Sequence, residues 1–172
     1  MIIENKFSSD RHTSNYLESG PKDGPLIMFF HGWPELSHSW RHQLKFFGEK
    51  GYHVVAPDMR GYGESTIHKN KTDYSQREIV LDMVELFKSF KKESVIVVGH
   101  DWGSETAWSM ARHYPNYVSK IVSLCVPYAM LELEVNENSL EKLINRKTYP
   151  KDLYPFGQWD YQVFYMKDFE KA

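Results

Sequence analysis

The chain has 172 residues, of which 41% are hydrophobic and 26% are charged, and its formal net charge is −2. This length and composition are those of a soluble globular protein with a substantial core. Lysine and arginine are spread along the chain. We therefore expect no nucleic-acid partner and no attraction to an anionic membrane surface.

The start of the chain and its cysteine content favour a cytoplasmic location. The first residues, Met-Ile-Ile-Glu-Asn-Lys, carry charge and lack the apolar segment of a signal peptide. The longest apolar run, residues 26–30, is far too short to span a bilayer, so no membrane span is expected. Cys125 is the single cysteine and cannot form an internal disulfide, and its apolar neighbours predict that it fills the core.

Predicted strands and helices alternate along residues 1–128. The polar, alternating stretch 11–19 is typical of an antiparallel edge strand, and the all-apolar run 26–30 is typical of a strand buried on both faces. Apolar residues recur at helical spacing over 39–47 and again after Ser75, which is placed to cap a long helix. The remaining predicted elements are strands over 53–57, 95–98 and 118–126 and a helix over 104–113.

This alternation predicts an α/β fold with a mostly parallel sheet flanked by helices, because helices of this length make right-handed crossovers between parallel strands. After Pro127 the composition changes, which predicts a domain boundary near residue 128. Residues 131–146 are acidic and contain leucines, so they predict a helix, and an aromatic stretch with prolines follows. The expected organisation is a core over 1–128 and a second region over 129–172.

The most informative motif is Gly99-His-Asp-Trp-Gly103, which directly follows the apolar run 95–98. A G-x-D-x-G turn between a strand and a helix is a nucleophile elbow in which Asp101 replaces the usual serine. A carboxylate attacks a saturated electrophilic carbon and forms an alkyl ester that water then hydrolyses, so an epoxide or an alkyl halide is the expected substrate. Gly99 and Gly103 are expected to let the backbone pass close to neighbouring elements.

Two more loops are expected at the same edge of the sheet, because open parallel sheets place their sites at the carboxyl ends of the strands. They are His31-Gly-Trp-Pro-Glu35 and the loop over 58–65. In a nucleophile elbow the amide after the nucleophile, here that of Trp102, is one oxyanion donor, and the loop after the third strand supplies the other, here Trp33. The 58–65 loop lacks the spacing of a phosphate-binding loop, so we expect it to support the site.

Each of these residues also has a plainer interpretation. Asp101 could cap the following helix, although the apolar strand before it and the loop at His31 favour catalysis. His31 and His100 could act as bases, but the favoured interpretation is that both are scaffold histidines that hold the loops. The ring of Trp102 either packs in the core or lines the substrate pocket, and we favour the pocket.

Together, His31-Gly32-Trp33-Pro34, the 58–65 loop and the elbow resemble the α/β-hydrolase-fold epoxide hydrolases, and the resemblance covers essentially the whole chain. It implies a cis bond between Trp33 and Pro34 and a helical cap that begins within 129–172. In that family cap tyrosines hydrogen-bond the epoxide oxygen as the ring opens, and the resemblance of the segment around Tyr161 to the first such motif implies this role for it. The implied partners are a small hydrophobic epoxide and water, and we expect no cofactor and no metal.

The sequence departs from the family's pattern after the elbow. The family uses a histidine, oriented by an acid, to activate water, and the one histidine after Asp101 is His113, about three helical turns from the elbow. No general base, orienting acid or second cap tyrosine is assigned, and the C-terminal strands of the sheet are missing. We therefore expect a truncated chain that at most forms the alkyl-enzyme. An unfinished sheet exposes apolar edge surface, so self-association is also expected.

Two other functions stay open. A haloalkane dehalogenase shares the aspartate nucleophile and the following tryptophan, but it usually has an asparagine at the position of Trp33. A non-catalytic remnant or binding protein would explain the missing histidine, whereas the intact elbow argues against it. A serine esterase is excluded because Ser104 lies outside the nucleophile position of the elbow.

Overall fold

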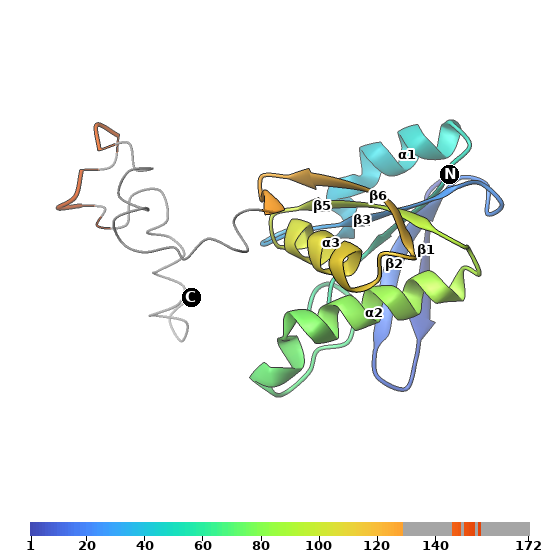
Figure 1. Cartoon of the computed structure of the whole chain (residues 1–172), viewed down its shortest axis with the longest axis horizontal. Helices are drawn as coiled ribbons and strands as arrows, with labels where there is room; N and C mark the ends of the chain where they lie inside the picture. Colours follow the sequence, from blue (N-terminus) through green and yellow to red (C-terminus); the bar gives the residue numbers. More distant parts are fainter. Residues whose placement is uncertain (129–145, 149, 154, 156–172) are drawn as a thin grey trace. The chain divides into compact units, whose positions relative to one another are not determined.

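The computed structural model describes residues 1–128, 146–148, 150–153 and 155 (Figure 1). The chain divides into two compact units, Met1–Leu131 and Glu132–Ala172. The described residues of the second unit include turns at 146–148 and 151–153. The helix predicted over 131–146 lies outside the described residues up to residue 145.

A six-stranded sheet with the order β1-β2-β4-β3-β5-β6 forms the centre of the first unit. β4, β3, β5 and β6 are parallel to one another, β2 pairs antiparallel with β4, and β1 pairs antiparallel with β2. The mostly parallel α/β sheet predicted from the alternating pattern is therefore confirmed. The strands are β1 (Ile3–Ser8), β2 (Thr13–Ser19), β3 (Leu26–Phe30), β4 (His53–Pro57), β5 (Val95–His100) and β6 (Val118–Leu124).

Helices cover both faces of this sheet. Figure 1 shows α1 on one face and α2 and α3 on the other. The predicted helix over 39–47 divides into a 3-10 turn and α1, and the helix predicted from residue 104 begins two residues earlier. No helix among the described residues is long and apolar enough to cross a membrane. The helical elements are η1 (Ser37–Trp40), α1 (Arg41–Glu49), η2 (Lys71–Tyr74), α2 (Gln76–Ser89) and α3 (Trp102–His113).

The core lies on the two faces of β3, which is buried along its whole length. Leu26, Met28 and Phe30 join the apolar cluster that includes α2 and α3 residues, and Ile27 and Phe29 join the cluster on the α1 side. This alternation follows from the two-residue period of a strand, which points successive side chains to opposite faces. Burial on both faces fixes β3, and the loop that follows it carries His31 and Trp33.

The prediction of an edge strand over 11–19 is wrong in its position, although the antiparallel direction is right. β2 lies between β1 and β4, so β1 is the strand at this edge of the sheet. The polar sequence of β2 suggested exposure, but Asn15 and Glu18 are only 2% exposed. Asn15 donates to Asp58 and Glu18 bonds His53, so these polar side chains are buried with partners.

Cys125 is exposed, so the prediction that it fills the core is wrong. β6 ends at Leu124, and Cys125 has a φ of 75°, in the left-handed region that non-glycine residues rarely adopt. The carbonyl of Val126 accepts hydrogen bonds from Trp108 Nε1 at 3.0 Å and from Ser123 Oγ. These bonds hold a turn at the point where the apolar sequence predicted two more strand residues.

Candidate active site

Asp101 lies at the sharp turn between β5 and α3. Its φ of 53° and ψ of −123° are unusual for a residue with a side chain and indicate a strained backbone. The Asp101 N–H donates to the carbonyl of Leu124 at 3.3 Å, and its carbonyl accepts from the Ser104 N–H at 2.9 Å. The Ser104 hydroxyl lies 2.7 Å from the Gly99 carbonyl and 2.8 Å from that of Leu124, so it links the turn to β6.

Glycines allow three backbone segments to meet at this turn. A Cβ atom on Gly99 would lie 2.2 Å from the carbonyl oxygen of Gly103, and one on Gly103 would lie 2.1 Å from that of Phe30. A Cβ atom on Gly32 would lie 2.5 Å from Asp101 Oδ1. Real Cβ atoms do not approach other atoms this closely. The end of β3, the end of β5 and the start of α3 can therefore pack together only with glycine at these positions.

A backbone amide of the loop after β3 meets the Asp101 carboxylate. The Trp33 N–H donates to Asp101 Oδ1 at 3.0 Å. Trp102 is the first residue of α3, and amides in the first turn of a helix have no acceptor within the helix. The Trp33–Pro34 bond is cis, as the resemblance implies. The Trp33 and Trp102 side chains are 39% and 59% exposed, so neither ring is a core residue.

Both histidines of the site loops are already hydrogen-bonded. His31 is 1% exposed, its Nε2 bonds the Met59 N–H at 2.9 Å, and its Nδ1 bonds the Gly32 carbonyl at 2.9 Å. His100 Nδ1 lies 3.0 Å from Glu35 Oε2, which joins the elbow to the loop after β3. These contacts are those of histidines that hold loops in place.

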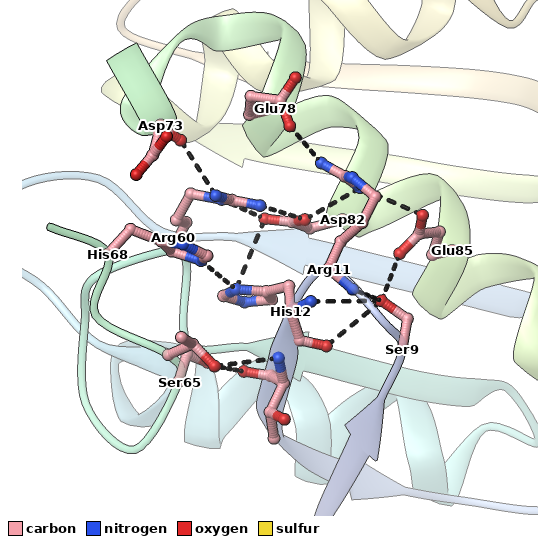
Figure 2. Close-up of polar contacts among 12 residues, drawn as sticks. Ser9, Arg11, His12, Arg60, Ser65, His68, Asp73, Glu78, Asp82 and Glu85 are labelled. Atoms are coloured by element: carbon pink, nitrogen blue, oxygen red, sulfur yellow. Dashed lines mark hydrogen bonds and ion pairs between the residues drawn. The ribbon is translucent and has the colours of Figure 1, made fainter. Parts of the chain in front are cut away.

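A buried ion pair anchors the 58–65 loop to α2 (Figure 2). Arg60 Nε and Nη2 donate to the two oxygens of Asp82 at 2.6 and 2.7 Å, and Arg60 Nη1 donates to the Asp73 carbonyl. Asp82 was not singled out from the sequence, although an acid inside the apolar run 79–84 is the signal that marks it. Asp58 does not pair with Arg60; it accepts from the Ser37 N–H at 2.9 Å, which ties the loop to η1.

A second residue that the sequence did not single out is Tyr62. Its ring packs edge-on against His31, with 5.0 Å between the ring centroids. Burial raises the pKa of the Tyr62 phenol, and the negative charge of Asp101 raises it further. Tyr161, the expected cap tyrosine, lies outside the described residues. Within the part of the chain that is described, no group of three or more histidines, cysteines or acids is placed to hold a metal.

The family comparison matches this architecture. Residues 25–161 match the family model described as alpha/beta hydrolase fold, which covers more than half of the chain. The chain belongs to the alpha/beta hydrolase fold family. The six-stranded sheet and the elbow after β5 are therefore the core of an α/β-hydrolase, and the three loops described above lie at the ends of its strands.

Relatives of this α/β-hydrolase include proteins named as epoxide hydrolases. The chain is 42% identical over 108 residues to "Epoxide hydrolase B" of Mycobacterium tuberculosis, which covers 63% of the chain and 30% of the relative. It is 41% identical over 105 residues to "Epoxide hydrolase 2" of Siraitia grosvenorii, which covers 61% of the chain and 33% of the relative. Over the part that it spans, the chain is therefore similar to proteins named as epoxide hydrolases.

Solved structures of epoxide hydrolases superpose on this chain. The epoxide hydrolase VrEH1 from Vigna radiata superposes with a TM-score of 0.73 at 31% identity, over 86% of this chain and 48% of that one. Epoxide hydrolase A from Mycobacterium thermoresistibile superposes with a TM-score of 0.72 at 35% identity, over 74% of this chain and 40% of that one. The chain thus spans about a third of the length of the curated relatives quoted and less than half of these structures.

Proposed function

We propose that this α/β-hydrolase opens a small hydrophobic epoxide through an ester on Asp101. A carboxylate oxygen of Asp101 forms a bond to one epoxide carbon while the bond from that carbon to the ring oxygen breaks. The ring oxygen takes a proton from a phenol donor, for which Tyr161 is the candidate. Water then adds to the ester carbonyl, the diol leaves with the oxygen that attacked, and the carboxylate is regenerated with one oxygen from water.

The bond from the Trp33 N–H to Asp101 Oδ1 is the observation that carries this proposal. Hydrolysis of the ester places negative charge on the oxygen that does not carry the alkyl group, and a donor already aimed at that oxygen stabilises the charge. The first-turn amide of Trp102 and the positive end of α3 act in the same direction. The strained backbone at Asp101 supports the same role, because such strain is concentrated at functional sites.

The substrate class follows from the nucleophile and the walls beside it. A carboxylate nucleophile suits a strained, electrophilic carbon, and the names of the relatives favour an epoxide over an alkyl halide. Trp102 follows Asp101 in the sequence, Trp33 donates its N–H to the Asp101 carboxylate, and both exposed tryptophans offer apolar surface. Because His31 and His100 already bond elsewhere, we assign the water-activating base to neither of them.

The test is intact-protein mass spectrometry after incubation with styrene oxide. Because the exposed Cys125 thiol is itself a nucleophile, both samples carry Cys125→Ser, and one of them also carries Asp101→Asn. We expect a one-substrate mass increment in the first sample only. Hydroxylamine should remove the increment, since it cleaves esters and not ethers. In a sample without hydroxylamine, the adduct should map to the tryptic peptide 93–112.

An increment that persists after Asp101→Asn, or no increment and no diol with Asp101 intact, would overturn the proposal. Diol measured in the same samples shows whether the ester is also hydrolysed. Sustained diol production would show that the ester is formed and hydrolysed repeatedly. That result would leave the role of Asp101 as the nucleophile intact.

A further inference from the structure

The hydrogen bonds around His31 determine which of its ring nitrogens carries the proton. The Met59 backbone N–H can only donate, so His31 Nε2, 2.9 Å away, must be the acceptor. A neutral imidazole that accepts at Nε2 carries its proton on Nδ1. That nitrogen lies 2.9 Å from the Gly32 carbonyl, which can only accept, so Nδ1–H donates to it.

The carbonyl of Gly32 and the N–H of Trp33 belong to the same peptide unit. His31 therefore bonds one end of the unit whose other end donates to Asp101 Oδ1 at 3.0 Å. A hydrogen bond accepted by the carbonyl of an amide polarises the amide and makes its N–H a stronger donor. All bonds in this series point the same way, from the Met59 N–H through His31 and the Gly32–Trp33 peptide to the Asp101 carboxylate.

We propose that His31 is a positioning residue that acts through the Gly32–Trp33 peptide. Its Nδ1–H tautomer orients this peptide and strengthens the donor that meets the charge on Asp101. The inference rests on the proposed function, because the strengthened donor matters for a reaction that develops negative charge on Oδ1. In this role His31 orients and polarises a peptide, which differs from acting as a base and from only packing against the loop.

The surroundings of His31 favour the neutral ring that this task requires. The side chain is 1% exposed, and burial lowers its pKa below the ordinary value. The bond to the Gly32 carbonyl and the charges of Asp58 and Glu35 act in the opposite direction, and the Tyr62 ring covers one side. Protonation of Nε2 would place its hydrogen against that of the Met59 N–H, so the charged ring would break the series.

The donor at the start of the series is itself held rigidly. Met59 lies between Asp58, which accepts from the Ser37 N–H, and Arg60, which makes the two-bond contact with Asp82 on α2 (Figure 2). Both Arg60 and Asp82 are buried. Because the residues on each side of Met59 are fixed to different elements, its N–H has little freedom to turn away from His31.

Two substitutions separate the halves of the series. In His31→Asn the side-chain amide can stand in for Nδ1–H and donate to Gly32, while the acceptor for Met59 is lost. In His31→Gln the longer side chain can reach Met59 and accept there, while the donor to Gly32 is lost. Each variant removes one of the two bonds, so their losses of stability should be similar. His31→Leu removes both bonds.

The direct readout is nuclear magnetic resonance of ¹⁵N-labelled protein, which needs no catalysis. Long-range spectra of the histidine rings should show the His31 proton on Nδ1. The Trp33 amide proton should stay near its wild-type, downfield position in His31→Asn and move upfield in His31→Gln and His31→Leu. A proton on Nε2, or equal Trp33 shifts in the Asn and Gln variants, would overturn the inference.

The kinetic readout follows the ester formed with styrene oxide, in the Cys125→Ser background. We expect loss of the ester at pH 9 to be about tenfold slower in His31→Gln than in His31→Asn, because removing an oxyanion donor outright costs about 100-fold or more. The rate of ester formation should differ less between the two. If the protein with His31 intact never forms an ester on Asp101, the proposed function fails, while the proton position and the Trp33 shift still decide the inference about His31.

Discussion

Gly32 lies against the side chain of Asp101 so closely that a Cβ atom at Gly32 would stand 2.4 Å from the Cβ of Asp101. The contact is between two loops 69 residues apart in the sequence. It places the peptide that follows Gly32 within hydrogen-bonding distance of the Asp101 carboxylate. The absence of a side chain at position 32 is therefore a requirement of the site geometry.

Gly32→Ala should abolish or greatly slow adduct formation at Asp101. The new methyl group cannot fit beside Asp101, so the loop after β3 must move and the Trp33 N–H must leave Oδ1. Adduct formation with styrene oxide, measured by intact mass, should fall at least about tenfold. Leu36→Ala in the same loop, where the side chain is 42% exposed, is the control and should leave the rate near wild type.

Asp82→Asn should destabilise the first unit by about 3–5 kcal/mol, because it leaves the buried Arg60 guanidinium without its charged partner. Urea unfolding followed by circular dichroism measures this loss. The matched control is Lys6→Ala, which breaks the exposed pair with Glu64 and should cost less than about 1 kcal/mol. Similar losses in the two variants would show that the Arg60–Asp82 pair does not anchor the loop.

His12 should make the protein less stable as the pH falls from 6.5 toward 4. Burial lowers the pKa of His12 from 6.5 to about 4, and the charges of Arg60 and Arg11 act in the same direction against Asp82. Between these values the unfolded chain binds a proton that the folded chain does not, so the stability is complete above 6.5 and is lost through this window. The slope contributed by one such group approaches about 1.4 kcal/mol per pH unit.

The measurement is the free energy of unfolding in urea at several values between pH 5 and 6, above the range where most carboxylates titrate. His31 and His53 also have lowered pKa values and add to the slope in the same direction. His12→Gln should therefore reduce the slope of the unfolding free energy against pH by the contribution of one proton. The slope that remains comes from the other histidines. An unchanged slope in this variant would show that His12 is not buried in its neutral form.

Cys125 should react rapidly with a thiol reagent in the native protein. It is the single cysteine, it is exposed, and it follows the last residue of β6. Labelling with a maleimide in native buffer should proceed within a few-fold of its rate in urea. Labelling that occurs only after unfolding would restore the prediction of a core residue, and Cys125→Ser should show none in either condition.

The α/β class and the position of the elbow could be predicted because local patterns specify them. An apolar run of five residues between turn signals is typical of a strand buried on both faces, and Gly99 and Gly103 bracket the one residue that a sharp strand-to-helix turn presents. The order of β1 and β2 could not be predicted in this way. Glu18 is polar, and its burial depends on His53, which is 35 positions away in the sequence.

The sequence by itself determined the alternation of strands and helices, the sharp turn at Asp101 and the loops that accompany it, because periodicity and glycine placement act over a few residues. Only the tertiary structure decided which buried charges meet, that Cys125 faces solvent, and that His31, Gly32 and Trp33 form one directed series of hydrogen bonds onto Asp101. A hydrogen bond depends on distances and angles between atoms that the fold brings together from distant positions. Residue types alone do not contain those distances.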